Sequence, residues 1–246
     1  LDKQFASAQP ALRAWAAQEA AKALQPADYF PAVLRLLSDD PVPAVRVAAA
    51  RSAGDIGKEN AVDALRKCLD DEIPALRVAG VDALAKAAGD KAAPDIVRML
   101  GASQPRAVRE AAIAALKGLK PKGFAAAAAT LLEAELGRPA PESVAAGLIE
   151  LLGSLRDEAG IDVLVKALRT STDKSIRFRA VKSLGEIGTP PAAAPLIAEL
   201  DRPAAEQEKD VVAEAVTALA QVGGDAARAR LEKALGEFID HDNPNP

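Results

Sequence analysis

Apolar and small residues recur along this chain at positions i, i+4, i+5 and i+8, which is the spacing of a buried stripe on an amphipathic helix. The segment PALRVAGVDALAKAAGD, residues 74–90, carries the pattern clearly. Its stripe consists of Leu76, Gly80, Val81 and Leu84. The chain shows neither the alternation of a half-buried strand nor a hairpin turn, so the pattern predicts an all-α protein.

A similar motif returns at nearly constant intervals. When the copies are aligned on the residue after the first aliphatic side chain, they lie 33, 31, 32, 36, 32 and 36 residues apart. The aligned residues are Arg13, Arg46, Arg77, Arg109, Ala145, Arg177 and Ala213. Seven copies at this spacing indicate a repeat protein. We call the helix that holds each copy a motif helix, and we count positions from its aligned residue.

Each motif helix is followed by a second apolar stretch, such as AVDALRKCL from Ala61. Pro43 and Pro74 stand at entrances of motif helices, where a first-turn proline loses no intrahelical hydrogen bond. The sequence thus predicts seven motif helices and seven follower helices. Because one helix pair cannot bury both of its apolar faces, the pairs are expected to stack into one solenoid over residues 1–240, with 241–246 as a polar tail.

Composition narrows the class of protein. The chain has 246 residues, of which 50% are hydrophobic but only 3% aromatic, so its core must be mostly Ala, Leu, Val and Ile. With 31 basic and 35 acidic residues the net charge is -4. Nucleic-acid modules usually carry a basic excess, so this balance argues against such a partner, although a local basic strip stays open. No apolar run reaches the roughly 18 residues that a membrane span needs.

The residues for common catalytic sites are absent from the sequence. His241, the only histidine, lies in the polar tail, so the Ser-His-Asp and Cys-His arrangements lack a base. Cys68, the only cysteine, stands beside Leu65 and Leu69 and is interpreted as a small buried hydrophobe in preference to a reactive thiol. We therefore expect no catalytic residues, no metal site and no cofactor, and predict that the protein is not an enzyme.

Two segments, LLSDDPVPAVRVAAARSAGDIG and CLDDEIPALRVAGVDALAKAAGD, carry a family resemblance. They resemble HEAT repeats, and most closely the short bacterial HEAT-like type that also occurs in phycobilisome lyases. The resemblance extends over residues 10–237. It implies a right-handed α-α superhelix of about seven two-helix repeats, with motif helices on the concave side and follower helices on the convex side.

The resemblance also implies a ladder in which an aspartate before a motif helix meets the motif arginine of the same or a neighbouring repeat. The sequence matches it where Asp40 precedes Arg46 and where Asp71 precedes Arg77. Serines, Ser103 and Ser171, stand before the next two arginines instead. The expected structural ladder is Asp40, Arg46, Asp71, Arg77, Arg109 and Arg177. Its arginines are interpreted as structural in preference to ligand-binding, because partly buried charges are usually paired.

In the helical interpretation, positions +1 and +5 of each motif helix face away from the core. Val47, Val78 and Phe178 are apolar residues at position +1, where solvent alone would favour polar ones. Either they line a groove that binds a protein, or the helices are rotated and these residues touch the next layer. The partner-binding candidates are Val47, Arg51, Val78, Asp82, Glu110, Glu150, Phe178 and Lys182.

Two other features could bear on binding. Trp15, in the first motif helix, is expected to cap the core of a terminal repeat, with a binding hot spot as the alternative. The two intervals of 36 place extra residues at 137–143 and 201–209. These loops either border a binding face or have drifted neutrally.

The sequence therefore predicts a non-catalytic scaffold or adaptor that binds a protein or peptide on the concave face. The resemblance offers an alternative, a phycobilisome-lyase-like or chaperone-like subunit that handles a tetrapyrrole. Nucleic-acid binding, as in some HEAT-like glycosylases, is a more remote possibility. A monomer is favoured, with the oligomeric state otherwise open. The location is open between the cytoplasm and export with a signal peptide removed.

Overall fold

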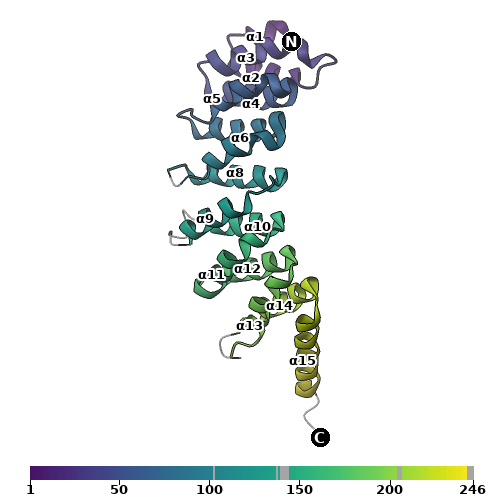
Figure 1. The fold of residues 1–246 in the computed structure, drawn as a ribbon. Coiled ribbons are helices and arrows are strands. Elements are labelled where there is room, and N and C mark those ends of the chain that lie inside the picture. Colours follow the sequence, from purple (N-terminus) through teal and green to yellow (C-terminus); the bar gives the residue numbers. More distant parts are fainter. Residues whose placement is uncertain (102, 137, 139–143, 204–206, 243–246) are drawn as a thin grey trace. The chain divides into compact units, whose positions relative to one another are not determined.

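The computed structural model describes residues 1–101, 103–136, 138, 144–203 and 207–242, without the side chains of 237–242 (Figure 1). Within these ranges the chain consists of helices and their connections, and no residue forms a β-strand. The chain divides into two compact units, Leu1–Pro121 and Lys122–Pro246. Each unit is a stack of helical hairpins, so the predicted all-α class is confirmed.

The first unit contains four motif helices, α2, α4, α6 and α8. Its helices are α1 (Asp2–Phe5), α2 (Pro10–Ala20), α3 (Phe30–Asp39), α4 (Pro43–Gly57), α5 (Val62–Cys68), α6 (Pro74–Ala88), α7 (Ala93–Arg98) and α8 (Arg106–Leu119). Short 3-10 segments lead into the follower helices, namely η1 (Pro26–Tyr29), η2 (Lys58–Ala61) and η3 (Gly89–Ala92). Each follower packs on the motif helix after it, and consecutive motif helices pack on one another.

The second unit repeats this arrangement with the motif helices α10, α12 and α14. Its helices are α9 (Ala125–Glu135), α10 (Ala145–Leu155), α11 (Ile161–Thr170), α12 (Lys174–Ile187), α13 (Ala193–Leu200), α14 (Lys209–Val222) and α15 (Asp225–Asp242). The 3-10 segments here are η4 (Glu158–Gly160) and η5 (Pro190–Ala192). With α3, α5, α7, α9, α11, α13 and α15 as followers, the predicted seven motif helices and seven followers are present in the described residues.

Polar turns set the start of the motif helices. The side chain of Asp40 accepts a hydrogen bond from the backbone N–H of Val42 at 2.9 Å, just before Pro43 opens α4. Asp71 accepts from the N–H of Ile73 at the same distance before α6. This turn two residues before the helix stops the follower and redirects the chain. It therefore fixes where each hairpin closes.

The predicted buried stripe forms the core. Leu76, Val81 and Leu84 are all buried, as the spacing requires. Two residues depart from the prediction in the second unit. Val212 is half-buried while Val211 is buried, and Ile176 is only half-buried while its neighbour Arg177 is buried. The physical reason at Ile176 is an ion pair, because the guanidinium of Arg177 lies 2.5 Å from the carboxylate of Glu199 on α13.

Consecutive motif helices approach closely through small residues. A Cβ at Gly54 of α4 would lie 2.7 Å from the Cα of Ala83 on α6, closer than packed atoms allow. In the second unit a Cβ at Gly153 would lie 2.9 Å from the Cα of Ser183. The hydroxyl of Ser183 also donates to the carbonyl of Ile149 at 2.9 Å. Position +8 of one motif helix thus meets position +6 of the next, which explains how a chain poor in aromatic residues builds a dense core.

Several expectations fall at the edges of the described residues. Helix α15 extends to Asp242, while residues 243–246 and the side chain of His241 lie outside them. The insertions at 137–143 and 201–209 fall partly outside them as well. None of the described helices combines the length and the apolar character needed to cross a bilayer.

Candidate functional site

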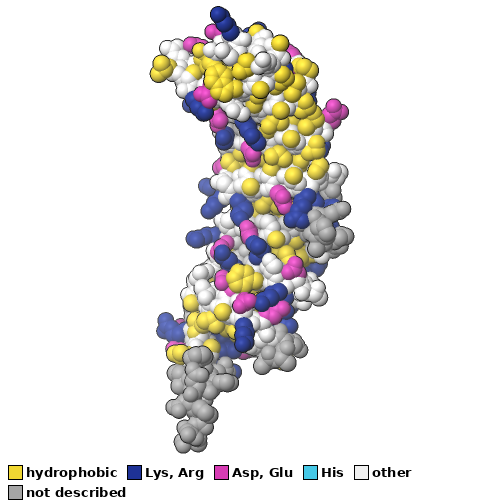
Figure 2. Space-filling view, turned by 180° about the vertical axis from the view of Figure 1, so that it is seen from behind, with side chains coloured by type: hydrophobic (Ala, Val, Ile, Leu, Met, Phe, Trp, Pro, Cys, Tyr) yellow, Lys and Arg dark blue, Asp and Glu magenta, His cyan; other side chains and the backbone are white. Residues whose placement is uncertain are grey.

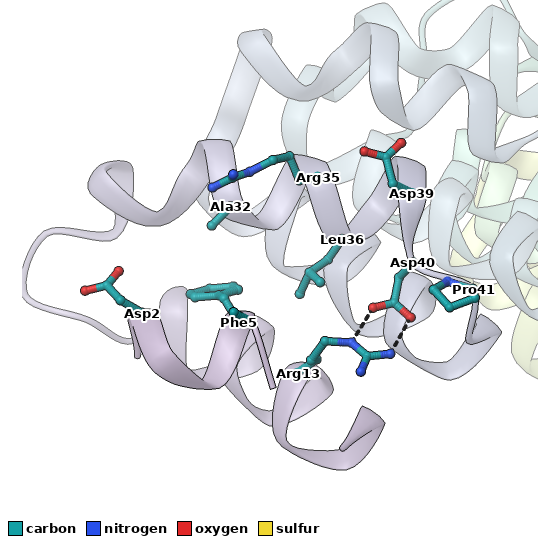
Figure 3. Close-up of a pocket in the computed structure, with 10 residues that line it drawn as sticks. Asp2, Phe5, Arg13, Ala32, Arg35, Leu36, Asp39, Asp40 and Pro41 are labelled. Atoms are coloured by element: carbon teal, nitrogen blue, oxygen red, sulfur yellow. Dashed lines mark hydrogen bonds and ion pairs between the residues drawn. The ribbon is translucent and has the colours of Figure 1, made fainter. Parts of the chain in front are cut away.

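The arginine–aspartate ladder joins each repeat to the next. Arg13 on α2 lies 2.6 Å from the carboxylate of Asp40, which precedes α4 (Figure 3). Arg46 on α4 lies 3.7 Å from Asp71, which precedes α6. The sequence left open whether each arginine pairs with the aspartate of its own repeat or with that of a neighbouring repeat. Both contacts are of the second kind. Arg46 therefore pairs with Asp71 and not with Asp40 of its own repeat.

Asp40 is the best-satisfied member of this ladder. Its carboxylate accepts hydrogen bonds from Nε of Arg13 at 2.6 Å and from Nη2 at 3.0 Å, besides the one from Val42. The hydrogen bonds from Arg13 are the main reason that the pKa of Asp40 falls below its ordinary value, although burial opposes the shift. Since Asp40 is 6% exposed, this charge is held inside the protein by its partners.

The ladder changes after the second repeat. Ser103 occupies the place of the aspartate before α8, and the Nε of Arg77 has no hydrogen-bond partner among the described residues. Before α12, Ser171 keeps the turn by accepting from the N–H of Asp173 at 3.1 Å. The preceding motif helix has Ala145 at the aligned position, so no arginine there requires an acceptor.

The last two ladder candidates are buried arginines. Arg109 on α8 is 2% exposed. Arg177 on α12 is also buried and pairs with Glu199 from the follower helix, as described above. Glu199 also approaches Arg202 at 3.5 Å. An acidic residue inside the follower helix therefore takes the part that the aspartate before the motif helix plays in the first unit.

Grooves lie between successive follower helices, over the ladder residues. The one between α1 and α3 has a volume of about 500 Å³, with Phe5 and Leu36 pointing into it above the Arg13–Asp40 pair (Figure 3). A second groove, between α3 and α5, has a volume of about 340 Å³, and both members of the Arg46–Asp71 pair line it. A third, between α11 and α13, measures about 210 Å³. The short helix α1 therefore lies where a follower helix lies in later repeats.

Cys68 lines the groove between α3 and α5. Its thiol is buried and lies 3.4 Å from the carbonyl of Ala64. Burial is the main cause that raises the pKa of the thiol to about 11, and the nearby charge of Asp71 adds to the effect. A thiol with this pKa stays protonated at neutral pH and is a weak nucleophile.

The exposed face of the motif helices in the first unit mixes aliphatic and charged side chains. Val47 on α4 and Val78 on α6 are half-buried, whereas Arg51, Asp82 and Glu110 are exposed. Neighbouring atoms shield the carboxylate of the exposed Asp82 in part from water, which raises its pKa, and the positive charges of Arg51 and Lys86 partly offset this effect. The valines are thus neither free in solvent nor fully packed, and their part in binding a partner stays a prediction.

The corresponding face of the second unit carries an aromatic residue. Phe178 on α12 is half-buried and Lys182 is exposed. Glu150 on α10 forms an ion pair with Arg179.

Ala218 on α14, which the helical wheel places in solvent, is instead buried. The reason is a shift of one residue in the alignment of the last repeat. A Cβ on Gly185 would lie 2.6 Å from that of Ala218, so Ala218 takes the place that Ala83 and Ser183 have in the earlier repeats, and Val212, not Ala213, is the aligned residue of α14.

Surface chemistry varies along the molecule. Figure 2 shows hydrophobic side chains gathered over the N-terminal repeats on the face it presents, with charges of both signs further along the chain.

Sequence reasoning gave Arg13 no role in the ladder, although its place in the first motif offered the signal. It also missed Glu199 and Lys86, which no repeat spacing distinguishes. Trp15, expected to cap the core, is 47% exposed.

The HEAT repeats family accounts for this architecture. Its sequence profile matches residues 3–79, 31–117 and 128–207, which together make up most of the chain. The protein therefore belongs to the HEAT repeat family. No curated protein matches the chain.

Several solved structures are similar to this chain. The complex of CpcE and CpcF of phycocyanin lyase from Nostoc sp. PCC7120 is 24% identical with a TM-score of 0.49, over 93% of this chain and 91% of that one. Human deoxyhypusine hydroxylase is 22% identical with a TM-score of 0.43, over 89% and 81%. An engineered protein is 21% identical with a TM-score of 0.38, over 89% and 94%.

Proposed function

We propose that the protein is a non-catalytic scaffold or adaptor that binds a protein or peptide along the exposed face of its motif helices. One observation carries the proposal. Val47 and Val78 occupy the same position on two motif helices that pack side by side, and both keep part of their aliphatic surface accessible. Position +1 in a helix that only faced solvent would not need an aliphatic residue in consecutive repeats.

Charges around the valines would give the surface its selectivity. Arg51 and Asp82 are exposed at position +5 of the same two helices, and Lys86 pairs with Asp55 at 2.9 Å across them. A partner segment with apolar side chains over the valines could place an acidic group near Arg51 and a basic group near Asp82. Such rim charges act mainly on association rate and choice of partner.

The proposal is tested by exchanging two charges on this face. In the variant Arg51→Asp with Asp82→Arg the net charge is unchanged, and both sites are exposed, so the fold should persist. We expect the affinity for the partner to fall at least about tenfold, because each charge then meets a like charge. Affinity capture with the wild-type chain supplies the partner, and titration of the purified partner measures the loss.

A matched control lies on the follower helices. Asp70 and Arg98 form an exposed ion pair at 3.0 Å, and Asp70→Arg with Arg98→Asp exchanges that pair in the same way. This control should bind like the wild-type chain. Equal binding by all three proteins would remove the motif-helix face as the docking surface. A visible spectrum that shifts when a bilin is added, and no longer shifts in the Arg51/Asp82 variant, would favour the tetrapyrrole alternative instead.

A further inference from the structure

A motif arginine in the middle of the ladder lacks an acceptor. Arg77 on α6 occupies the position of Arg13 and Arg46, each of which lies close to an aspartate before the next motif helix. In the described part of the chain the guanidinium of Arg77 takes part in no hydrogen bond or ion pair, and its Nε is buried without a partner. Its two terminal nitrogens are not buried, so a group from outside the chain can reach them.

The turn before α8 does not require an aspartate of its own. Asp40 and Asp71 each accept a hydrogen bond from the backbone N–H two residues later, at 2.9 Å. Ser103 stands at the corresponding place, and two residues after it comes Pro105, which has no N–H to offer. A carboxylate at position 103 would therefore serve Arg77 alone.

The second unit contains a place where both members of a ladder pair are absent. Before α12 the turn has Ser171 instead of an aspartate, and the preceding motif helix has Ala145 instead of an arginine. No guanidinium is left without an acceptor there. At Arg77, by contrast, only the acceptor is absent. A partly buried guanidinium without an acceptor costs free energy, and a carboxylate supplied by another molecule would remove that cost.

An unpaired acceptor lies in the same turn. The Oε1 of Gln104, the residue after Ser103, is buried and has no hydrogen-bond partner in the ranges that the structure describes. The place therefore combines guanidinium donors that need a carboxylate with an acceptor that needs an N–H. A free carboxylate ion satisfies only the donors, whereas an acidic residue of a polypeptide brings both a carboxylate and a backbone N–H.

We propose that Arg77 binds the side-chain carboxylate of an aspartate or glutamate from a partner polypeptide, and that Gln104 accepts a backbone N–H of the same segment. Arg13 shows the arrangement, since its Nε and Nη2 donate to the two oxygens of Asp40. Such paired hydrogen bonds are the preferred contact between arginine and a carboxylate. The site uses the aligned position of α6 and not positions +1 and +5, so it is separate from the surface of the proposed function.

The missing acceptor is tested by supplying one from within the chain. Ser103 is exposed, so Ser103→Asp should leave the fold intact. We expect it to raise the midpoint of thermal unfolding by about 2–4 °C, because the new carboxylate pairs with Arg77. In the background of Arg77→Gln the same substitution should give no gain. Ser171→Asp is the matched control, because Ala145 offers it no guanidinium, and it should give no gain either.

Binding from outside is measured on the full chain by NMR. The Nε–H resonance of Arg77, assigned by its loss in Arg77→Gln, is followed at constant ionic strength. The probes are N-acetylglutamate amide, which has both groups, acetate, which lacks the N–H, and N-acetylglutamine amide, which lacks the charge. We expect the glutamate probe to shift the resonance at about fivefold lower concentration than acetate. The glutamine probe should leave it in place up to about 100 mM.

Two variants define the site of the response. Ser103→Asp should abolish the shift by the glutamate probe, because its own carboxylate then occupies Arg77. The variant Arg51→Asp with Asp82→Arg should respond like the wild type, so this proposal and the proposed function can fail separately.

Four results would overturn the proposal. They are an unfolding midpoint that Ser103→Asp does not raise, or raises equally without Arg77, a resonance that the glutamate probe does not move, a glutamine probe as effective as the glutamate probe, and acetate as effective as the glutamate probe, which would assign the site to a free carboxylate ion.

Discussion

The pair of Arg13 and Asp40 shows how a single interaction fastens two repeats. The guanidinium donates two hydrogen bonds to the carboxylate, which also receives the backbone N–H that opens the next motif helix. The same carboxylate therefore caps the turn before α4 and links α4 to the hairpin that contains Arg13. Losing it would leave the guanidinium without its acceptor as well as the turn without its cap.

Replacing Asp40 with Ala should lower the free energy of unfolding by about 2 kcal/mol. This value lies below that of a fully buried pair because Arg13 stays partly exposed. Chemical denaturation monitored by circular dichroism measures the loss. The neighbouring Asp39 is exposed, so Asp39→Ala is the matched control and should stay within about 0.5 kcal/mol of the wild type. Equal losses in both variants would contradict a specific role for Asp40.

The same pair gives stability a defined pH dependence. The pKa of Asp40 in the folded chain lies below its ordinary value of 3.8, so the unfolded chain binds this proton more readily. The stabilisation is therefore complete above that ordinary value and is lost as the pH falls through the lower folded pKa. In Asp40→Asn this part of the acid dependence should be missing.

At the scale of single residues, the sequence indicated which residue types form ion pairs, but not which residue each one pairs with. The family resemblance implied an arginine–aspartate ladder. It did not tell whether Arg46 meets Asp40 or Asp71, because that depends on how far one hairpin is displaced from the next. Glu199 could not be found either, since its role arises only where α13 passes Arg177.

Among the elements, the motif helices are set apart by how closely they pack. The apolar stripe predicted these helices well, because its period alone defines a buried face. Helix α4 runs from Pro43 to Gly57, as the motif indicates. The exposure of Val47 and Val78 was harder to predict, because a wheel places a side chain relative to its own helix and ignores the distance to the next one. Ala218 was misplaced because the repeat spacing put the aligned residue of α14 one position too late.

Replacing Gly54 with Ala should destabilise the protein by about 1–3 kcal/mol, because the new methyl would push α4 away from α6. Gly118 in α8 is the matched control. A Cβ there meets nothing within 4 Å, so Gly118→Ala should stabilise the helix by about 0.5 kcal/mol. Thermal and denaturant unfolding compare the two. A Gly54→Ala protein as stable as the wild type would show that the helices can separate without loss.

Across the whole molecule, each repeat packs mainly on the repeats next to it in the sequence. In such repeat proteins stability is close to a sum of repeats and the interfaces between them. Composition and repeat spacing sufficed to predict this organisation. They could not identify a partner, because recognition depends on a few partly exposed side chains, such as Val47 and Phe178, on an otherwise ordinary helical surface.

A fragment of residues 1–121 should therefore fold without the rest of the chain. It contains four motif helices and the follower helices α3, α5 and α7, and it forms one of the two compact units. We expect helical circular dichroism and cooperative thermal unfolding, with Asp40→Ala as destabilising in the fragment as in the full chain. A fragment that lacks helical structure would contradict this independence.

The ladder and the hydroxyl contact between motif helices also bear on how the chain acquires its structure. Arg13 and Asp40 are 27 positions apart, and Ser183 reaches back only 34 positions to Ile149. Bonds this local require only small loops to close, which makes folding fast. The first hairpins can then assemble while later ones are still being synthesised on the ribosome, so the growing chain need not expose its whole apolar interior at once.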